Sequence, residues 1–186
     1  MSRRPAFSLV ELIIVVVIIG IGAAIAVPRY GRSLNRYRAQ LAAERVAEEL
    51  RFAAEHARSR EIGVDATVDT GADSLTLVES TGSNAGDVVG TLRVDEAPYG
   101  ARLFLALRES GLGSPAFDAQ GVPDADAIVV VMAGDMYVVV ALYQGDPSPQ
   151  VWPPRVWGGS TVDVSSPSEP AGTSVATGAG LMEAGP

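Results

Sequence analysis

The stretch Phe7-Ser8-Leu9-Val10-Glu11-Leu12-Ile13-Ile14 opens an apolar run, residues 7–27, whose only charged side chain is Glu11. At ~1.5 Å per residue, a helix of this length crosses the ~30 Å hydrocarbon core of a bilayer. A carboxylate carried into that core costs ~2.5–3.5 kcal/mol on insertion scales, so its presence needs a reason. A short basic leader ending in a small residue, Met1-Ser2-Arg3-Arg4-Pro5-Ala6, precedes the run. This arrangement favours a subunit of an assembly over an enzyme.

The composition of the 186-residue chain excludes several kinds of site and partner. There is no cysteine, which excludes disulfides, thiolate zinc sites and cysteine nucleophiles. The net charge is -8 and is unevenly spread, because residues 1–60 hold 10 arginines against 5 acids and residues 61–186 hold 4 arginines against 17 acids. Nucleic-acid binding needs a basic face, so we expect no nucleic-acid partner for this acidic part.

Hydrophobic periodicity predicts one long helix from about residue 7 to about residue 61, with Gly63 as a plausible stop. Its first half is apolar on every side, its second half is amphipathic, and a break or kink is expected at Pro28. We expect a leader at 1–6, a membrane and assembly helix at 7–28, an amphipathic helix at 29–62, a β domain at 63–164 and a disordered tail at 165–186.

The β domain shows short alternating runs separated by turn residues. The expected strands are Val64–Asp69, Ser74–Glu79, Val88–Val94, Ala101–Leu107, Ala127–Met132 and Tyr137–Tyr143, with a last strand around Arg155–Val164 anchored by Trp152 and Trp157. The valine-rich pair Ala127–Met132 and Tyr137–Tyr143 is expected at the centre of a sheet. The predicted fold is α+β: a long N-terminal helix packed on an antiparallel sheet or small sandwich.

The N-terminal sequence resembles that of type IV pilins and pseudopilins. The resemblance is carried by Ala6-Phe7-Ser8-Leu9-Val10-Glu11-Leu12 and by Gly20-Ile21-Gly22-Ala23-Ala24-Ile25-Ala26-Val27-Pro28. It implies that a prepilin peptidase cuts between Ala6 and Phe7, that the new amine of Phe7 is methylated, and that Glu11 guides assembly. The family normally has Gly before the cut, where this chain has Ala6. The resemblance also implies a single-pass bacterial inner-membrane protein with a periplasmic C-terminal domain.

A weaker resemblance, resting on Phe117, Gly121 and Pro123, points to the GspH/FimT pseudopilins of type II secretion and type IV pilus systems. The lack of a possible disulfide also favours a pseudopilin or minor pilin. The implied partners are other pseudopilins or pilins, the prepilin peptidase, an inner-membrane assembly platform and membrane lipid. No cofactor is expected. The competing interpretation of the three residues is an ordinary turn.

Other interpretations remain open at this stage. The N-terminus also fits a secretory signal with a cut after Ala24-Ile25-Ala26, which leaves Glu11 unexplained. The segment Arg29, Arg32, Arg36, Arg38 is either a solvated helix face or a contact for lipid headgroups or acidic neighbours. The chain could instead be a minor pilin with a ligand- or DNA-binding domain, or a membrane-anchored or secreted binding protein with no filament role.

Catalytic signals are weak, and the chain is expected not to be an enzyme. The only histidine, His56, is predicted on the surface of the helix rather than as a ligand or base. Asp118, Asp124 and Asp126 match no calcium-loop spacing and are expected to be solvated loop acids, so no metal site is predicted.

Overall fold

The computed structural model describes residues 9–108, 111–157, 162–163 and 174–175. The chain divides into two units, residues 1–34 and residues 35–186. The predicted leader and the predicted cleavage site at Ala6 and Phe7 lie outside the described residues, as does most of the predicted tail.

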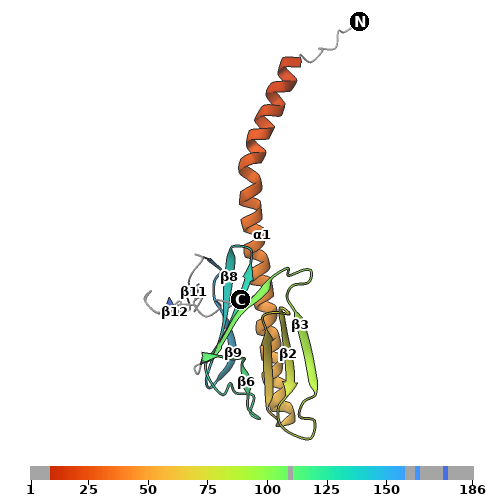
Figure 1. Ribbon diagram of the computed structural model, residues 1–186, viewed down its shortest axis with the longest axis vertical. Coiled ribbons are helices and arrows are strands. Elements are labelled where there is room, and N and C mark those ends of the chain that lie inside the picture. The colour runs from red at the N-terminus through yellow and green to blue at the C-terminus, as the bar shows by residue number, and fades with distance from the viewer. Residues whose placement is uncertain (1–8, 109–110, 158–161, 164–173, 176–186) are drawn as a thin grey trace, which may run out of the picture. The chain divides into compact units, whose positions relative to one another are not determined.

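One helix, α1 (Leu9–Arg60), accounts for all the helical structure among the described residues (Figure 1). Pro28 lies inside α1 and does not end it, in contrast to the predicted helix break. Proline removes one amide donor, here the one that would bond the carbonyl of Ala24, and the helical bonds on both sides keep the segment helical.

The C-terminal end of α1 is closed by a Schellman motif. Glu61 takes the left-handed conformation (φ 55°), and the amide of Ile62 donates to the carbonyl of Ala57 at 3.1 Å. The predicted stop at Gly63 is thus close in position, but Glu61 takes the left-handed backbone conformation. Gly63 is buried beside Ser80 and Thr81, where its amide bonds the Thr81 hydroxyl at 2.6 Å.

A first antiparallel sheet has the order β3-β2-β1-β6. Its strands are β1 (Val64–Asp69), β2 (Ser74–Glu79), β3 (Val88–Arg93) and β6 (Ala116–Phe117). The predicted β1 and β2 are confirmed residue for residue, and β3 ends one residue earlier than expected. The hairpin between β1 and β2 turns on Asp69, whose Oδ1 accepts hydrogen bonds from the amides of Gly71 and Ala72 at 2.8 and 2.9 Å.

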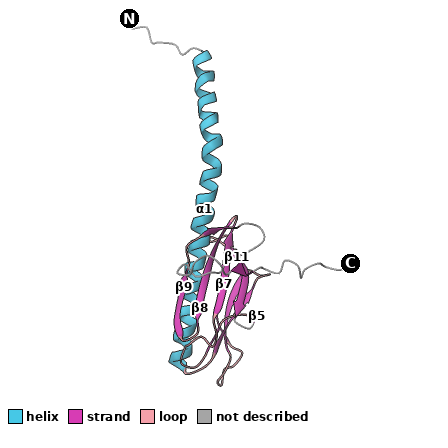
Figure 2. Cartoon of the chain, turned by 90° about the vertical axis from the view of Figure 1, so that its left-hand side faces the viewer, coloured by secondary structure: helices cyan, strands magenta, loops and turns pink. Residues whose placement is uncertain are grey.

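A second antiparallel sheet has the order β10-β8-β7-β4-β5, with β9 also paired to β8. Its strands are β4 (Arg102–Arg108), β5 (Gly111–Leu112), β7 (Ala127–Ala133), β8 (Met136–Tyr143), β9 (Asp146–Val151) and β10 (Arg155–Val156). The valine-rich β7 and β8 lie at the centre, as predicted (Figure 2). Two further short strands, β11 (Val162–Asp163) and β12 (Ser174–Val175), pair with each other. Of these, β12 lies within the range predicted as a disordered tail.

The core of the second unit lies where the C-terminal half of α1 meets both sheets. The helix presents mostly small residues there, each at most 4% exposed: Ala39, Ala42, Ala43, Val46, Ala47, Leu50, Ala53, Ala54 and Ala57. Because alanine adds only one carbon beyond the backbone, the strands can pack close to the helix axis. The fold class predicted from sequence, a helix packed on antiparallel sheet, is confirmed.

Candidate functional site

The described N-terminal part of α1 presents apolar side chains to its surroundings on every face. The exposed fractions of its large apolar side chains run from 42% at Val15 to 72% at Leu9. A core helix of a soluble protein would bury one face at least. By length and composition this helix is able to cross a membrane, and the exposed surface needs lipid or other helices to cover it.

Glu11 is the only charged side chain in this exposed apolar surface. It is the third residue of α1 as described and lies in the first turn, where a carboxylate is favoured by the positive end of the helix dipole. Its neighbours Val10 and Leu12 are 62% and 59% exposed, so no part of this unit encloses it. The predicted cleavage residues Ala6 and Phe7 lie outside the described residues.

Small residues leave gaps in the same helix surface. A Cβ placed on Gly20, Gly22 or Gly31 would meet nothing within 4 Å. None of these glycines is therefore required by a contact within the chain. Their exposed backbone would allow another helix to approach closely.

The structure separates the four arginines that follow the apolar run. Arg29 and Arg32 are exposed and belong to the first unit. Arg36 is exposed and Arg38 is half-buried in the second unit, where the Arg38 guanidinium lies beside Gly100. Arg29, Arg32 and Arg36 are thus open to solvent, lipid or a neighbouring protein, whereas Arg38 is half-buried.

The three residues of the weaker family resemblance come together in one turn on α1. Phe117 is 2% exposed and forms an isolated bridge with Pro123. Gly121 has φ 71°, and a Cβ there would collide with the carbonyl oxygen of Ala54 on the helix. The turn docks the loop against α1, and a hydrogen bond of 3.0 Å from Arg58 Nε to the carbonyl of Gln120 holds it there.

Asp118 organises this turn rather than a metal site. Its Oδ1 accepts hydrogen bonds from the amides of Gln120 and Val122, each at 2.9 Å. Asp126 is used in a similar way, accepting from the amide of Gln144 at 2.6 Å. Among the described residues, no group of three His, Cys, Asp or Glu side chains could hold a metal ion.

His56 is less exposed than the sequence indicated. Its Nε2 lies 3.0 Å from Oε1 of Glu79 on β2, and the two side chains are 15% and 7% exposed. Glu79 is the one buried charged residue in the described core, and Arg60 lies 4.0 Å from the same oxygen. A contact between residues 23 apart in sequence has no local signal, which is why sequence reasoning missed it.

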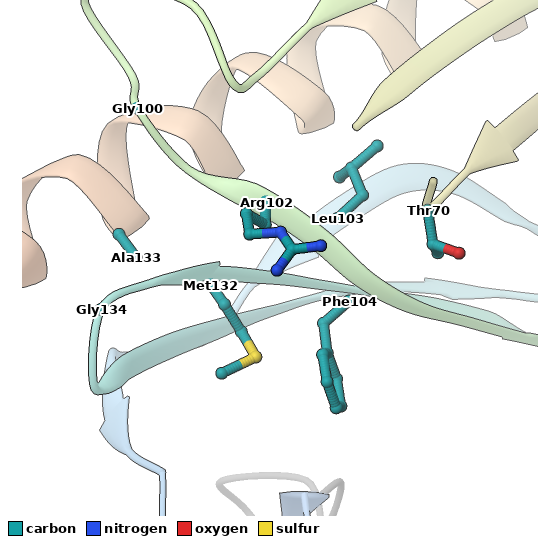
Figure 3. Close-up of a pocket in the computed structure, with 8 residues that line it drawn as sticks. All are labelled: Thr70, Gly100, Arg102, Leu103, Phe104, Met132, Ala133 and Gly134. Carbon is teal, nitrogen blue, oxygen red and sulfur yellow. The ribbon is translucent and has the colours of Figure 1, made fainter. Parts of the chain in front are cut away.

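An open cleft of about 520 Å³ lies on the second unit (Figure 3). Phe104 and Met132 form its apolar side, and Arg102 stands over them (Figure 3). The Nε of Arg102 is 3.4 Å from a carboxylate oxygen of Asp73, and the side chain is 74% exposed. This ion pair lies at the surface, where solvent screens it, so it contributes little to stability.

Comparison with known proteins gives one family-level match. Residues 1–27 match the prokaryotic N-terminal methylation motif. None of the curated proteins matches the chain. Among solved structures, the type IV minor pilin FimU of Pseudomonas aeruginosa is similar, with 17% identity, a TM-score of 0.44, and coverage of 63% of this chain and 88% of that one. By its N-terminal motif and its long helix packed on antiparallel sheets, the chain is type IV pilin-like.

Proposed function

We propose that this protein is a pseudopilin-like subunit of a filament, belonging to the GspH/FimT group of type II secretion or type IV pilus systems. A prepilin peptidase would cut between Ala6 and Phe7, and the new amine of Phe7 would be methylated. The mature subunit would then join the filament through α1. The observation that carries the proposal is a single carboxylate, Glu11, in the otherwise apolar and exposed surface of residues 9–24.

The Glu11 carboxylate and the Phe7 ammonium would each be costly to place alone in the membrane, and each would compensate the other as a pair. In the bilayer, the Glu11 carboxylate would lie beside the apolar side chains of Val10 and Leu12. Cleavage would create an ammonium on Phe7, four residues away along the chain. When a subunit enters a bundle, Glu11 of one subunit and the amine of a neighbour would form one pair in a low-dielectric setting. Such a pair would fix the axial stagger between subunits.

Lipid and neighbouring subunits would contact the same apolar surface of α1 at different stages. Before assembly, lipid would surround the apolar part of α1, with the second unit on the periplasmic side of the inner membrane. In the filament, neighbouring helices would replace lipid, and Gly20 and Gly22 would let them approach closely. The proposed partners are the peptidase, an assembly platform in the inner membrane and other pilin-like subunits.

The proposal includes no catalytic role. The single histidine contacts Glu79, and the carboxylates of Asp118 and Asp126 accept hydrogen bonds from backbone amides. The proposed function is mechanical: the subunit would prime or cap a filament that moves secreted cargo or supports a pilus.

Substitution of Glu11 tests this function. Glu11→Gln keeps the shape and removes the charge, so the protein should still be cleaved and inserted but should not enter filaments. Sheared-filament fractions compared with membrane fractions give the measurement. Glu55→Gln, an exposed glutamate on the same helix, is the matched control and should assemble normally. Normal assembly of Glu11→Gln would contradict the role given to Glu11.

A further inference from the structure

Two arginines and a tyrosine follow directly on the membrane-length part of α1. Arg29 and Arg32 are exposed, and Tyr30 is 71% exposed. All three belong to the same unit as the apolar helix, whereas Arg38 belongs to the second unit and is half-buried there. At ~100° per residue, Arg29 and Arg32 lie ~60° apart around the helix and so share one face.

The positions of Arg29 and Arg32 relative to the hydrocarbon core of a bilayer follow from the rise of the helix per residue. The apolar run ends at Val27, so Arg29 lies ~3 Å and Arg32 ~7.5 Å beyond the end of the hydrocarbon core. The headgroup layer on each side of a bilayer is ~5–8 Å thick. Tyrosine is enriched in that layer, and the planar guanidinium of arginine binds phosphate oxygens through paired hydrogen bonds.

We infer that Arg29, Tyr30 and Arg32 form a headgroup anchor, which binds anionic phospholipid phosphates at the C-terminal end of the membrane span. This inference rests on the membrane residence included in the proposed function. The ligand is a lipid phosphodiester whose headgroup carries a net negative charge. An acidic neighbouring subunit is the other candidate occupant, and in that case a single chain in a nanodisc would show no lipid preference.

The headgroup anchor would also set the position of the other end of the helix. With Val27 at one boundary of a ~30 Å core, Glu11 lies ~24 Å into the core, about one helical turn from the opposite boundary. The proposed cleavage site, which precedes Glu11 in the sequence, would then be kept within reach of a peptidase at the membrane surface. A helix that moved by one turn toward its C-terminal side would carry Glu11 deeper into the core.

Lipid retention in nanodiscs tests the binding. The full chain is placed in nanodiscs of equal parts phosphatidylglycerol and phosphatidylcholine, and retained lipids are counted by native mass spectrometry. The unaltered chain should retain phosphatidylglycerol preferentially, and Arg29→Gln/Arg32→Gln should lose about fivefold in preference per arginine. Arg36→Gln/Arg51→Gln removes the same charge farther along the helix, beyond the headgroup layer, and should keep the preference.

Depth measurement tests the positioning role. The chain has no cysteine, so Leu9→Cys gives a single labelling site for a fluorophore that depth-specific quenchers can report on. Arg29→Gln/Arg32→Gln should change the quenching profile at this site, and the Arg36→Gln/Arg51→Gln control should not. An unchanged depth in the first variant would overturn the positioning role.

Two results would overturn the lipid site. These are equal retention of the two lipids by the unaltered chain and an unchanged preference in Arg29→Gln/Arg32→Gln. A chain that fails to enter nanodiscs would contradict the membrane segment itself, and hence the proposed function. A chain that enters but shows no preference would contradict the headgroup anchor alone.

Discussion

At the residue scale, the structure explains why position 121 requires glycine, which the sequence pattern alone does not. Sequence alone indicates a turn with glycine and proline. The structure adds that this glycine faces the backbone of α1 at Ala54, so no side chain fits. The positive φ of 71° disfavours other residues for a second, independent reason.

Gly121→Ala should therefore destabilise the second unit by about 2–4 kcal/mol, combining backbone strain with the clash against Ala54. The measurement is the free energy of unfolding in urea. Gly145→Ala is the matched control, because Gly145 also has a positive φ (87°) but a Cβ there meets nothing within 4 Å. The control should lose about 1–2 kcal/mol from strain alone. Equal losses for the two variants would contradict the packing of this turn on the helix.

The His56–Glu79 pair is a second residue-scale feature that links the helix to a sheet. His56→Ala would leave the Glu79 carboxylate buried without its nearest donor, and should destabilise the fold by about 1–3 kcal/mol. A double-mutant cycle with Glu79→Gln measures the coupling, which should be at least about 0.5 kcal/mol for groups in direct contact. Zero coupling, with both single variants no worse than the exposed control Glu55→Ala, would show that the contact contributes nothing.

At the element scale, the packing of α1 depends on its small residues. Ala53 is fully buried against the sheets, and alanines dominate the buried face around it. Ala53→Leu should cost about 1–3 kcal/mol by overpacking, although leucine is itself a good helix former. Glu55→Leu, two residues on and exposed, is the control and should be nearly neutral. Thermal unfolding followed by circular dichroism measures both, and an unaffected Ala53→Leu would contradict close helix–sheet packing.

Periodicity predicted the helix and the strong strands because those elements carry their signal locally. In the sequence, the β7–β8 hairpin consists of two valine-rich runs that flank Gly134 and Asp135. In the structure, the two strands pair in a register that places Ala133 opposite Met136. The strand β9 was missed because Pro147 and Pro149 argue against a strand. It is tolerated because, among the described residues, β9 pairs only with β8, so one side of it needs no ladder bonds.

The short strands β5 and β6 lacked a usable local signal, because two residues cannot show alternation and each strand exists only beside a partner strand. The strand predicted around Arg155–Val164 corresponds, among the described residues, to the short strands β10 and β11, which belong to different sheets. The candidate site residues also differ in how well the sequence predicts them. Glu11 stands out in the sequence because a charge interrupts an apolar run, whereas the His56–Glu79 contact depends on the packing of α1 on β2.

At the scale of the whole molecule, charge and hydropathy separate along the chain. The first unit combines an exposed apolar helix surface with arginines at its end, and residues 61–186 are strongly acidic, with 17 acids against 4 arginines. An acidic surface repels nucleic acid and favours solubility. The separation suits a protein whose helix enters lipid or a helical bundle while its β-rich part remains in water.

The central claim is that residues 1–6 are removed to give a subunit that begins at Phe7. The direct test is intact-mass and N-terminal analysis of the protein purified from its own membrane. The expected product is a chain that starts at Phe7 and carries one added methyl group. A chain that starts at Val27, as cleavage after Ala24-Ile25-Ala26 would give, would show instead that this is an ordinary exported protein and not a filament subunit.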